Sequence, residues 1–328
     1  MAVNGTTRRI AVLTSGGDSP GMNPAVRAVV RTAIARGAEV LGIRRGYTGM
    51  FTHNFVKMNA RSVANIIDKG GTILGTSRCP QFLTPEGRQE ALTILQEAGI
   101  NGLVIIGGNG SLTGALELEK LGMPVIGLPG SIDNDLVGTD MAIGVDTCLN
   151  TIMSALDKIR DTASSHHRAF IIEVMGRNCG YLAQMACLNG GADVVVTPEN
   201  NPTLEEIAQQ LRQSRQRGRT HAIVIVAEGA HVKSQAIAHY LNKEIEEHYE
   251  TRLTILGHVQ RGGSPTSFDR TLATRLGARA VDALLAGKSG VMCGLVQGRF
   301  NETPLTEVVG KVRQIDLSIF ELVKIMSQ

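Results

Sequence analysis

The chain has 328 residues, of which 43% are hydrophobic and 38 are glycine, so it is long enough for two α/β units and too apolar for a disordered chain. A net charge of only +3, the absence of tryptophan and the lack of a basic run argue against nucleic acid as a partner. The five cysteines form no Cys-x-x-Cys pair, and no apolar run approaches the ~18 residues of a membrane span. We therefore expect a reduced, cytoplasmic protein with no membrane partner.

Short runs of Val, Ile, Ala and Leu alternate with longer helical patterns along the whole chain. Candidate strands cover residues 9–15, 38–44, 102–108, 123–130, 168–176, 193–198, 221–229, 251–257 and 290–298. Apolar strands that alternate with helices indicate mainly parallel sheets covered on both faces. Because these strands are many for one sheet, the sequence predicts two α/β halves.

Two helix starts are marked by a capping residue before a proline. Asn23 precedes Pro24, and Thr84 precedes Pro85. Asn and Thr side chains can cap a helix, and proline fits its first turn. Both predicted helices follow loops that could bind a ligand, because parallel α/β folds bind ligands at the carboxyl ends of their strands.

Two glycine-rich loops have the form of a phosphate cradle. Residues 13–23 contain Gly16 and Gly17, and residues 104–115 contain Gly107, Gly108 and Gly110. Glycine lets backbone N–H groups approach an anion, and we expect a helix to begin at Ser111 and offer its positive end. A plain strand-to-helix turn is the alternative. The glycine spacing differs from the dinucleotide fingerprint, and no Gly-Lys-Ser/Thr sequence indicates a Walker loop.

A third loop, residues 128–140, carries two carboxylates. Asp133 and Asp135 are two residues apart and project to the same side of an extended segment. Carboxylates that face a phosphate cradle suggest a metal site and a general base. A pair of Asx turns is the alternative.

Several cationic side chains flank glycines or predicted strand ends. Arginine forks suit phosphate oxygens, although scattered arginines are usually solvated surface residues. These candidates are Arg168, Arg177, Arg252, His258 and Arg261.

Taken together, the motifs LTSGGDSPGMN, IGGNGS, PGSIDND, EVMGR and GHVQRGGSP resemble the bacterial ATP-dependent type of 6-phosphofructokinase, from about residue 9 to about residue 300. The resemblance implies two Rossmann-like three-layer α/β domains with mainly parallel sheets and the active site in the cleft between them. The larger, nucleotide-binding domain would comprise residues 1–143 and 259–310. The smaller, fructose 6-phosphate-binding domain would comprise residues 144–258 and 311–328. The family also implies a homotetramer whose active sites are shared between subunits.

The resemblance also implies roles for single residues in moving the γ-phosphoryl group of ATP to fructose 6-phosphate, with Mg²⁺ as cofactor. Asp133 matches the general base, Asp135 its neighbouring carboxylate, and Asn109 with Asp135 the metal site. The catalytic set is Asp133, Asp135, Arg177 and Ser131. The nucleotide set is Gly17, Tyr47, Arg78, Cys79, Gly108, Asn109, Gly110 and Ser111. The sugar-phosphate set is Ser131, Ile132, Asp133, Arg168, Met175, Gly176, Arg177, Glu228, Arg252, His258 and Arg261.

The family's effector site is matched only in part. Its arginines correspond to Arg27, Arg31 and Arg160, its lysines to Arg217 and Arg219, and its usual glutamate to Asp193. Ala60 and Asn65 stand where the family has an arginine and an aspartate. The sequence therefore predicts a weak or altered response to ADP and phosphoenolpyruvate.

Three other functions remain open at this point. Pyrophosphate-dependent relatives typically carry Asp at the position of Gly110 and Lys at that of Gly130, so the two glycines favour ATP as the donor. A catalytically weak subunit that only binds sugar phosphate and nucleotide is suggested by Asn109, which stands where the family usually has aspartate. A nicotinamide dehydrogenase is disfavoured by the glycine spacing.

Overall fold

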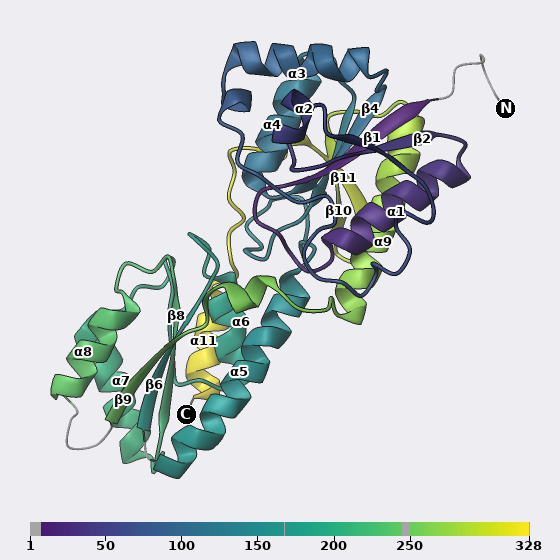
Figure 1. The fold of residues 1–328 in the computed structure, drawn as a ribbon. Coiled ribbons are helices and arrows are strands. Elements are labelled where there is room, and N and C mark those ends of the chain that lie inside the picture. The colour runs from purple at the N-terminus through teal and green to yellow at the C-terminus, as the bar shows by residue number, and fades with distance from the viewer. Residues whose placement is uncertain (1–7, 167, 245–249, 328) are drawn as a thin grey trace. The chain divides into compact units, whose positions relative to one another are not determined.

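The computed structural model describes residues 8–166, 168–244 and 250–327, which divide into two compact α/β units (Figure 1). The described residues of unit 1 fall within Met1–Ile132, Leu136–Thr147 and Arg261–Arg313. Those of unit 2 fall within Asp133–Asp135, Cys148–Gln260 and Gln314–Gln328. Each unit is thus assembled from three stretches of chain.

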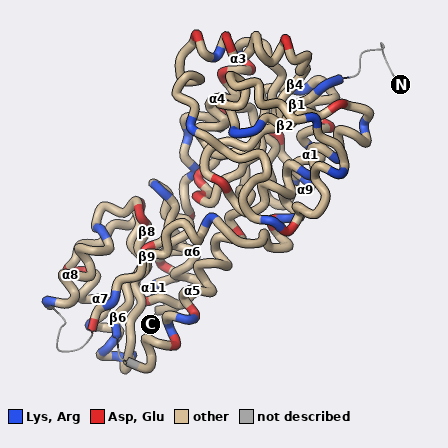
Figure 2. Tube along the Cα trace, in the orientation of Figure 1, with Lys and Arg blue, Asp and Glu red and all other residues tan. Residues whose placement is uncertain are grey.

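Lys and Arg positions are interspersed with Asp and Glu positions along the trace of each unit (Figure 2). No helix in the described part of the chain is long and apolar enough to cross a membrane. The mixture of both signs along the trace agrees with the small net charge of +3.

Unit 1 contains a seven-stranded sheet in the order β11-β10-β5-β4-β1-β2-β3. Its strands are β1 (Arg9–Ser15), β2 (Glu39–Ile43), β3 (Phe55–Met58), β4 (Gly102–Gly107), β5 (Val125–Pro129), β10 (Val291–Val296) and β11 (Arg299–Pro304). Only the two edge strands, β3 and β11, run antiparallel to their neighbours. The helical segments are α1 (Met22–Ala35), α2 (Thr48–Phe51), η1 (Gln81–Leu83), α3 (Pro85–Glu97), α4 (Asn109–Lys120), α9 (Ser267–Leu285) and α10 (Leu305–Val308).

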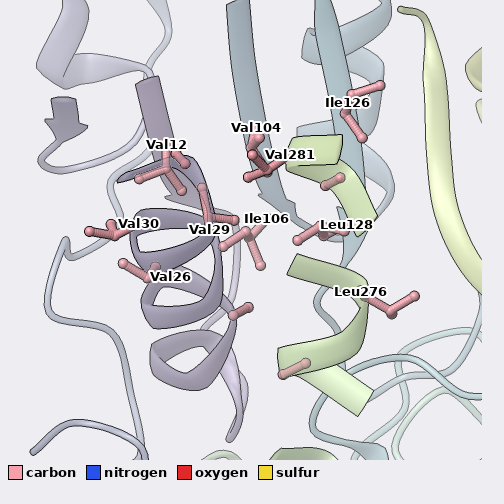
Figure 3. Close-up of a cluster of buried hydrophobic side chains, with 14 of the residues drawn as sticks. Val12, Val26, Val29, Val30, Val104, Ile106, Ile126, Leu128, Leu276 and Val281 are labelled. Carbon is pink, nitrogen blue, oxygen red and sulfur yellow. The ribbon is translucent and has the colours of Figure 1, made fainter. Parts of the chain in front are cut away.

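The core of unit 1 lies on both faces of this sheet. On one face, α1 and α9 pack side by side, and Val26, Val29 and Leu276 are buried in one cluster with strand residues such as Val12 and Ile106 (Figure 3). A second cluster contains side chains of α3 and α4 together with further residues of the same strands. The strands are therefore apolar on both sides, as a parallel sheet between two helical layers requires.

Unit 2 contains a four-stranded, fully parallel sheet in the order β7-β8-β6-β9. Its strands are β6 (Arg168–Val174), β7 (Val194–Val196), β8 (Ala222–Ala227) and β9 (Glu250–Ile255). Its helical segments are α5 (Val145–His166), α6 (Tyr181–Gly190), α7 (Leu204–Gln216), α8 (Ser234–Glu244), η2 (Gly257–Arg261) and α11 (Ser318–Met326), although the first residues of α5 and Arg261 belong to unit 1. The predicted class, Rossmann-like α/β with mainly parallel sheets, is confirmed.

One predicted helix cap is wrong and the other is confirmed. Helix α1 begins at Met22 with Gly21 as its N-cap, and Asn23 lies inside the helix. The Asn23 carboxamide instead donates to the carbonyls of Lys69 and Gly70 and accepts from the N–H of Ile73, so it fixes a distant loop. Thr84 caps α3 as predicted, because its hydroxyl accepts from the N–H of Gly87.

Candidate active site

Three loops of unit 1 leave adjacent strands at the same edge of the sheet. The register pairs Ser15 of β1 with Gly107 of β4, and Gly107 with Pro129 of β5. The three segments singled out in the sequence therefore meet at the carboxyl ends of neighbouring parallel strands, where such folds bind ligands.

Glycines allow these loops to pack closely. A Cβ atom on Gly107 would lie 2.5 Å from the Ser15 carbonyl oxygen and 2.5 Å from the Ser111 hydroxyl. Gly16 has a φ of +83°, and a Cβ there would lie 3.1 Å from the same hydroxyl. Since such contacts exclude a side chain, Gly107 lets the two glycine-rich loops touch.

Helix α4 begins at the second glycine-rich loop, two residues earlier than predicted. Gly108 is its N-cap and Asn109 its first residue, so Ser111 lies within the first turn. First-turn N–H groups lack intrahelical acceptors and carry the positive end of the helix dipole. This end of α4 therefore suits an anion such as a phosphate group.

Tyr47 packs beneath the start of α4 and contacts this loop through its hydroxyl. Its side chain is buried at 6% exposure, its ring stacks on Phe82 at 4.2 Å between centroids, and its hydroxyl donates to the Ser111 carbonyl at 2.6 Å. Burial raises the pKa of the Tyr47 phenol well above its usual range, so the hydroxyl remains a donor. Of the other residues expected around a nucleotide, Arg78 is exposed and Cys79 is partly buried against the core.

Arg261 lies beside the first glycine-rich loop. A Cβ atom on Gly17 would be only 2.4 Å from Nη1 of Arg261, so glycine is what admits the guanidinium there. The sequence analysis assigned Arg261 to a sugar phosphate and Gly17 to a nucleotide, and unit 1 holds these two residues together. A guanidinium at this position can neutralise a phosphate on the loop.

In unit 2, the Asp133 carboxylate faces Arg177. Asp133 is buried at 6% exposure, and its Oδ2 lies 3.7 Å from Nε of Arg177, whose side chain is 68% exposed. The intervening Asn134 adopts the left-handed conformation, with φ of +54°. That turn replaces the extended segment that the sequence analysis assumed between Asp133 and Asp135.

The Glu228 side chain holds the turn that carries Arg177 through the backbone N–H groups of the turn. Oε1 of Glu228 accepts from the N–H groups of Gly176 at 3.2 Å and Arg177 at 2.8 Å. Gly176 has a φ of +134°, and a Cβ on Gly229 would lie 1.7 Å from the Arg177 carbonyl oxygen. Glu228, assigned to the sugar from sequence, therefore also shapes the turn.

Cys179 follows this turn and is buried. Burial, with the negative charges of Glu199, Asp135 and Asp133, raises the pKa of its thiol to about 11. The thiol therefore stays protonated at neutral pH and is a poor nucleophile.

Three neighbouring strands of unit 2 end beside this turn. Val174 of β6 pairs with Ala227 of β8, and Glu173 of β6 pairs with Ile255 of β9. Met175–Arg177, Glu228 and the exposed His258 thus follow strand ends at one edge of the sheet.

Arg168 and Arg252 occupy a different part of unit 2. Arg168 is the first residue of β6, and both guanidiniums pair with Glu250, Arg168 through Nε at 2.7 Å. Strand β6 separates Arg168 from the Arg177 turn by about 20 Å at ~3.3 Å per residue. Arg252 pairs with Phe170 in the register of β9 and β6, four residues before β6 ends, so neither arginine lies at the Arg177 turn itself.

Of the expected effector residues, unit 2 joins Asp193 to Arg219. Nη1 of Arg219 lies 2.9 Å from Oδ1 of Asp193, which also accepts from the Ser214 hydroxyl, while Oδ2 accepts from the N–H of Ile223. Arg160 lies near Gly191, and Arg217 is exposed at the end of α7. Arg27 and Arg31 lie on α1 in unit 1.

Two residues that hold these turns, Gln260 and Glu199, are not among the candidates from the sequence. Gln260 accepts from the N–H of Met175 at 3.1 Å, and Glu199 accepts from the N–H of Gly180 at 2.9 Å. Gln260 stands between His258 and Arg261 in a motif that was already singled out, so its place was a usable signal. Among the described residues, no three His, Cys, Asp or Glu side chains gather as a metal site.

The chain is similar to known proteins over nearly its whole length. The family model described as "Phosphofructokinase" matches residues 9–284. The chain is 54% identical to "ATP-dependent 6-phosphofructokinase 1" of Thermus thermophilus, covering 98% of this chain and 99% of that protein. It is 53% identical to "ATP-dependent 6-phosphofructokinase" of Thermotoga neapolitana, covering 98% of this chain and 100% of that protein. A solved phosphofructokinase of Saccharomyces cerevisiae is 40% identical with a TM-score of 0.85, and the match covers 92% of this chain and 45% of the yeast chain.

Proposed function

The chain belongs to the phosphofructokinase family, and we propose that the residues described above carry out ATP-dependent phosphorylation of fructose 6-phosphate. The observation that most directly supports the assignment is the buried Asp133 carboxylate facing Arg177 beside the turn braced by Glu228. A base and a cation so arranged suit the two needs of phosphoryl transfer, positioning and charge neutralisation.

Asp133 is the general base of the proposed mechanism. Its carboxylate accepts the proton of the sugar 1-hydroxyl as that oxygen attacks the γ-phosphorus of ATP. The new O–P bond forms while the bond from the γ-phosphorus to the bridging oxygen breaks, and ADP leaves with that electron pair. Arg177 stabilises the charge on the transferring group, and the start of α4 binds the nucleotide phosphates.

The donor set fits Mg²⁺ delivered with the nucleotide. Mg²⁺ usually binds one or two carboxylates and substrate phosphates, and the described residues contain no larger acidic cage. Asp135 and Asn109 are the residues that would hold it. Bound there, Mg²⁺ would neutralise charge on the phosphates.

ATP is the phosphoryl donor, as in the names of the bacterial relatives. A Cβ on Gly110 meets nothing within 4 Å, so glycine leaves space beside the α4 cradle. At Gly130 a Cβ would lie 3.1 Å from Met22, and a lysine there would force its neighbours to move. A coupled assay of the purified chain with ATP or pyrophosphate tests this assignment, and turnover with pyrophosphate alone would overturn it.

Asn109→Asp is expected to lower the Mg²⁺ concentration that gives half-maximal rate. An amide oxygen can ligate Mg²⁺ or its waters but carries no charge, whereas a carboxylate binds this hard cation more strongly. The change should appear in kinetic Mg²⁺ titrations and in calorimetric binding of Mg²⁺ with ADP. Unchanged metal dependence in both would remove Asn109 from the metal site, and a wild-type chain inactive at saturating Mg²⁺ would indicate a binding subunit instead.

A homotetramer with shared active sites is part of the proposal. Arg168 begins β6 at the opposite end from the Arg177 turn, and Arg252 shares Glu250 with it, which supports their action on a partner subunit's sugar phosphate. Residues 1–143 with 259–310 would serve ATP, and residues 144–258 with 311–328 the sugar. None of the five cysteines forms a disulfide, which supports the proposed cytoplasmic location.

A weak response to ADP and phosphoenolpyruvate is expected. Asp193 and Arg219 form an ion pair with each other. Ala60 and Asn65 are uncharged side chains at positions where the family has an arginine and an aspartate. Initial rates at subsaturating fructose 6-phosphate, with and without each effector, measure this. Strong activation by micromolar ADP would contradict it.

A further inference from the structure

Gln260 is a buried carboxamide that joins two turns of unit 2. Its side chain is fully buried at 0% exposure. Its Oε1 accepts from the N–H of Met175 at 3.1 Å, and its Nε2 donates to the Gly257 carbonyl at 2.9 Å. One side chain therefore links the turn after β6 to the turn after β9.

Both linked turns carry residues of the proposed site. Met175 immediately precedes Gly176 and Arg177, and Gly257 begins η2, which carries His258 and Arg261. The Arg177 side chain is 68% exposed and lies 3.7 Å from Asp133, so its position depends on how its backbone is held. Glu228, the residue after β8, accepts from that backbone, and so does Gln260 in η2.

A carboxamide suits this place because it must accept on one side and donate on the other. An ionised glutamate could accept from the N–H of Met175 but could not donate to the Gly257 carbonyl, and a methionine could accept only weakly and could not donate. A buried carbonyl or N–H that loses its partner is costly, so the surrounding turns would shift to recover one.

We propose that Gln260 is a positioning residue, whose carboxamide sets the Arg177 turn against the His258 turn for phosphoryl transfer. The inference rests on the proposed function of these turns. Gln260 itself touches no reacting atom, so its effect reaches the substrates through Arg177 and His258. A displacement of ~1 Å in such a group can cost about 10²-fold in rate.

Gln184 provides a matched control. It is also 0% exposed in unit 2, and its Nε2 donates to a backbone carbonyl, that of Asp316, at 2.7 Å. Gln260→Met and Gln184→Met therefore each remove one buried carboxamide that ties two segments of the same unit. Comparison of the kinetic changes in these two variants separates an effect on the position of the site residues from a general loss of stability.

The experiment measures kcat, KM for each substrate and Tm for the wild type and both methionine variants. We expect both Tm values to fall by a few degrees. For Gln260→Met, kcat/KM for fructose 6-phosphate should fall about 10- to 100-fold while KM for ATP changes by less than about threefold. Gln184→Met should keep both within about threefold. Equal kinetic losses in the two variants, or wild-type kinetics in Gln260→Met, would overturn the inference.

Gln260→Glu gives a second test, available even if Gln260→Met does not fold. Only the protonated carboxyl can donate to the Gly257 carbonyl, and burial raises the pKa of such a group. The activity of Gln260→Glu, divided by that of the wild type at the same pH, should therefore rise as the pH falls. The same ratio for Gln184→Glu should not change with pH. A flat ratio for Gln260→Glu would count against positioning. Arg177→Ala is the reference variant. If Arg177→Ala keeps the wild-type rate, the proposed active site itself is wrong. If Arg177→Ala is inactive but Gln260→Met has wild-type kinetics, only the role of Gln260 is rejected.

Discussion

Asp133→Asn is expected to lower kcat by about 10²–10⁴-fold, the usual contribution of a positioned base, while fructose 6-phosphate still binds. The amide is nearly isosteric but cannot take the proton of the sugar hydroxyl. Because Asp133 is buried and faces Arg177, the substitution also removes the negative charge nearest that guanidinium. Steady-state kinetics with a binding measurement for the sugar phosphate separate these effects.

Asp140→Asn is the matched control for this loss. Asp140 lies in the same loop seven residues later, and its Oδ2 accepts from the backbone N–H of Gln297 in unit 1. We expect its kcat to stay close to wild type. If Asp133→Asn retains more than about a third of the wild-type kcat, the base must be sought elsewhere.

Arg168→Ala and Arg252→Ala are expected to raise KM for fructose 6-phosphate by about 10- to 100-fold each, with a smaller effect on kcat. A charge-assisted hydrogen bond to phosphate contributes about 1.5–3 kcal/mol, which corresponds to that range. The two guanidiniums share Glu250, so removal of one should also disturb the other. The free-energy loss calculated from KM of the double variant should therefore be smaller than the sum of the losses in the two single variants.

Arg212→Ala controls for general loss of surface charge in unit 2. Arg212 pairs with Glu205 on α7 at 2.9 Å, and neither residue belongs to the proposed site. Unchanged KM in both Arg168→Ala and Arg252→Ala would mean that the phosphate clamp lies elsewhere. If the clamp is shared between subunits, dilution to monomers should also abolish wild-type activity.

The sequence predicts the central strands of both units well because they are apolar throughout. Strand β1 is predicted to the residue, and β4, β6 and β8 to within two residues at each end. Strands β3 and β11 were not predicted. Both are edge strands with one partner, and each includes exposed polar or charged residues, such as Lys57 in β3, that interrupt any continuous apolar run.

The site is predictable where a residue's chemistry alone suggests its role, and not where a contact with a distant segment decides it. Asp133 and Arg177 stand in recognisable motifs, although Asn134 bends the carboxylate segment in a way that its sequence does not reveal. Tyr47 was expected beside a ligand but is buried with its hydroxyl on Ser111, 64 residues away. Asn23 likewise looks like a cap until the loop that it binds is known.

The interrupted path of the chain through unit 1 has a consequence for folding during synthesis. The strands of unit 2 all lie between Arg168 and Ile255, whereas α1 of unit 1 packs against α9, which begins about 230 residues after α1 ends. At ribosomal rates of about 5–20 residues per second, synthesis of the chain between α1 and α9 takes roughly 10–50 s, and during that time α9 cannot cover the apolar face of α1. The strands of the inserted unit are complete before α9 is made, so α1 is made early but is covered by its partner helix only late in synthesis. A nascent chain stalled before Ser267 should therefore expose Val26 and Val29 to chaperones or to neighbouring chains.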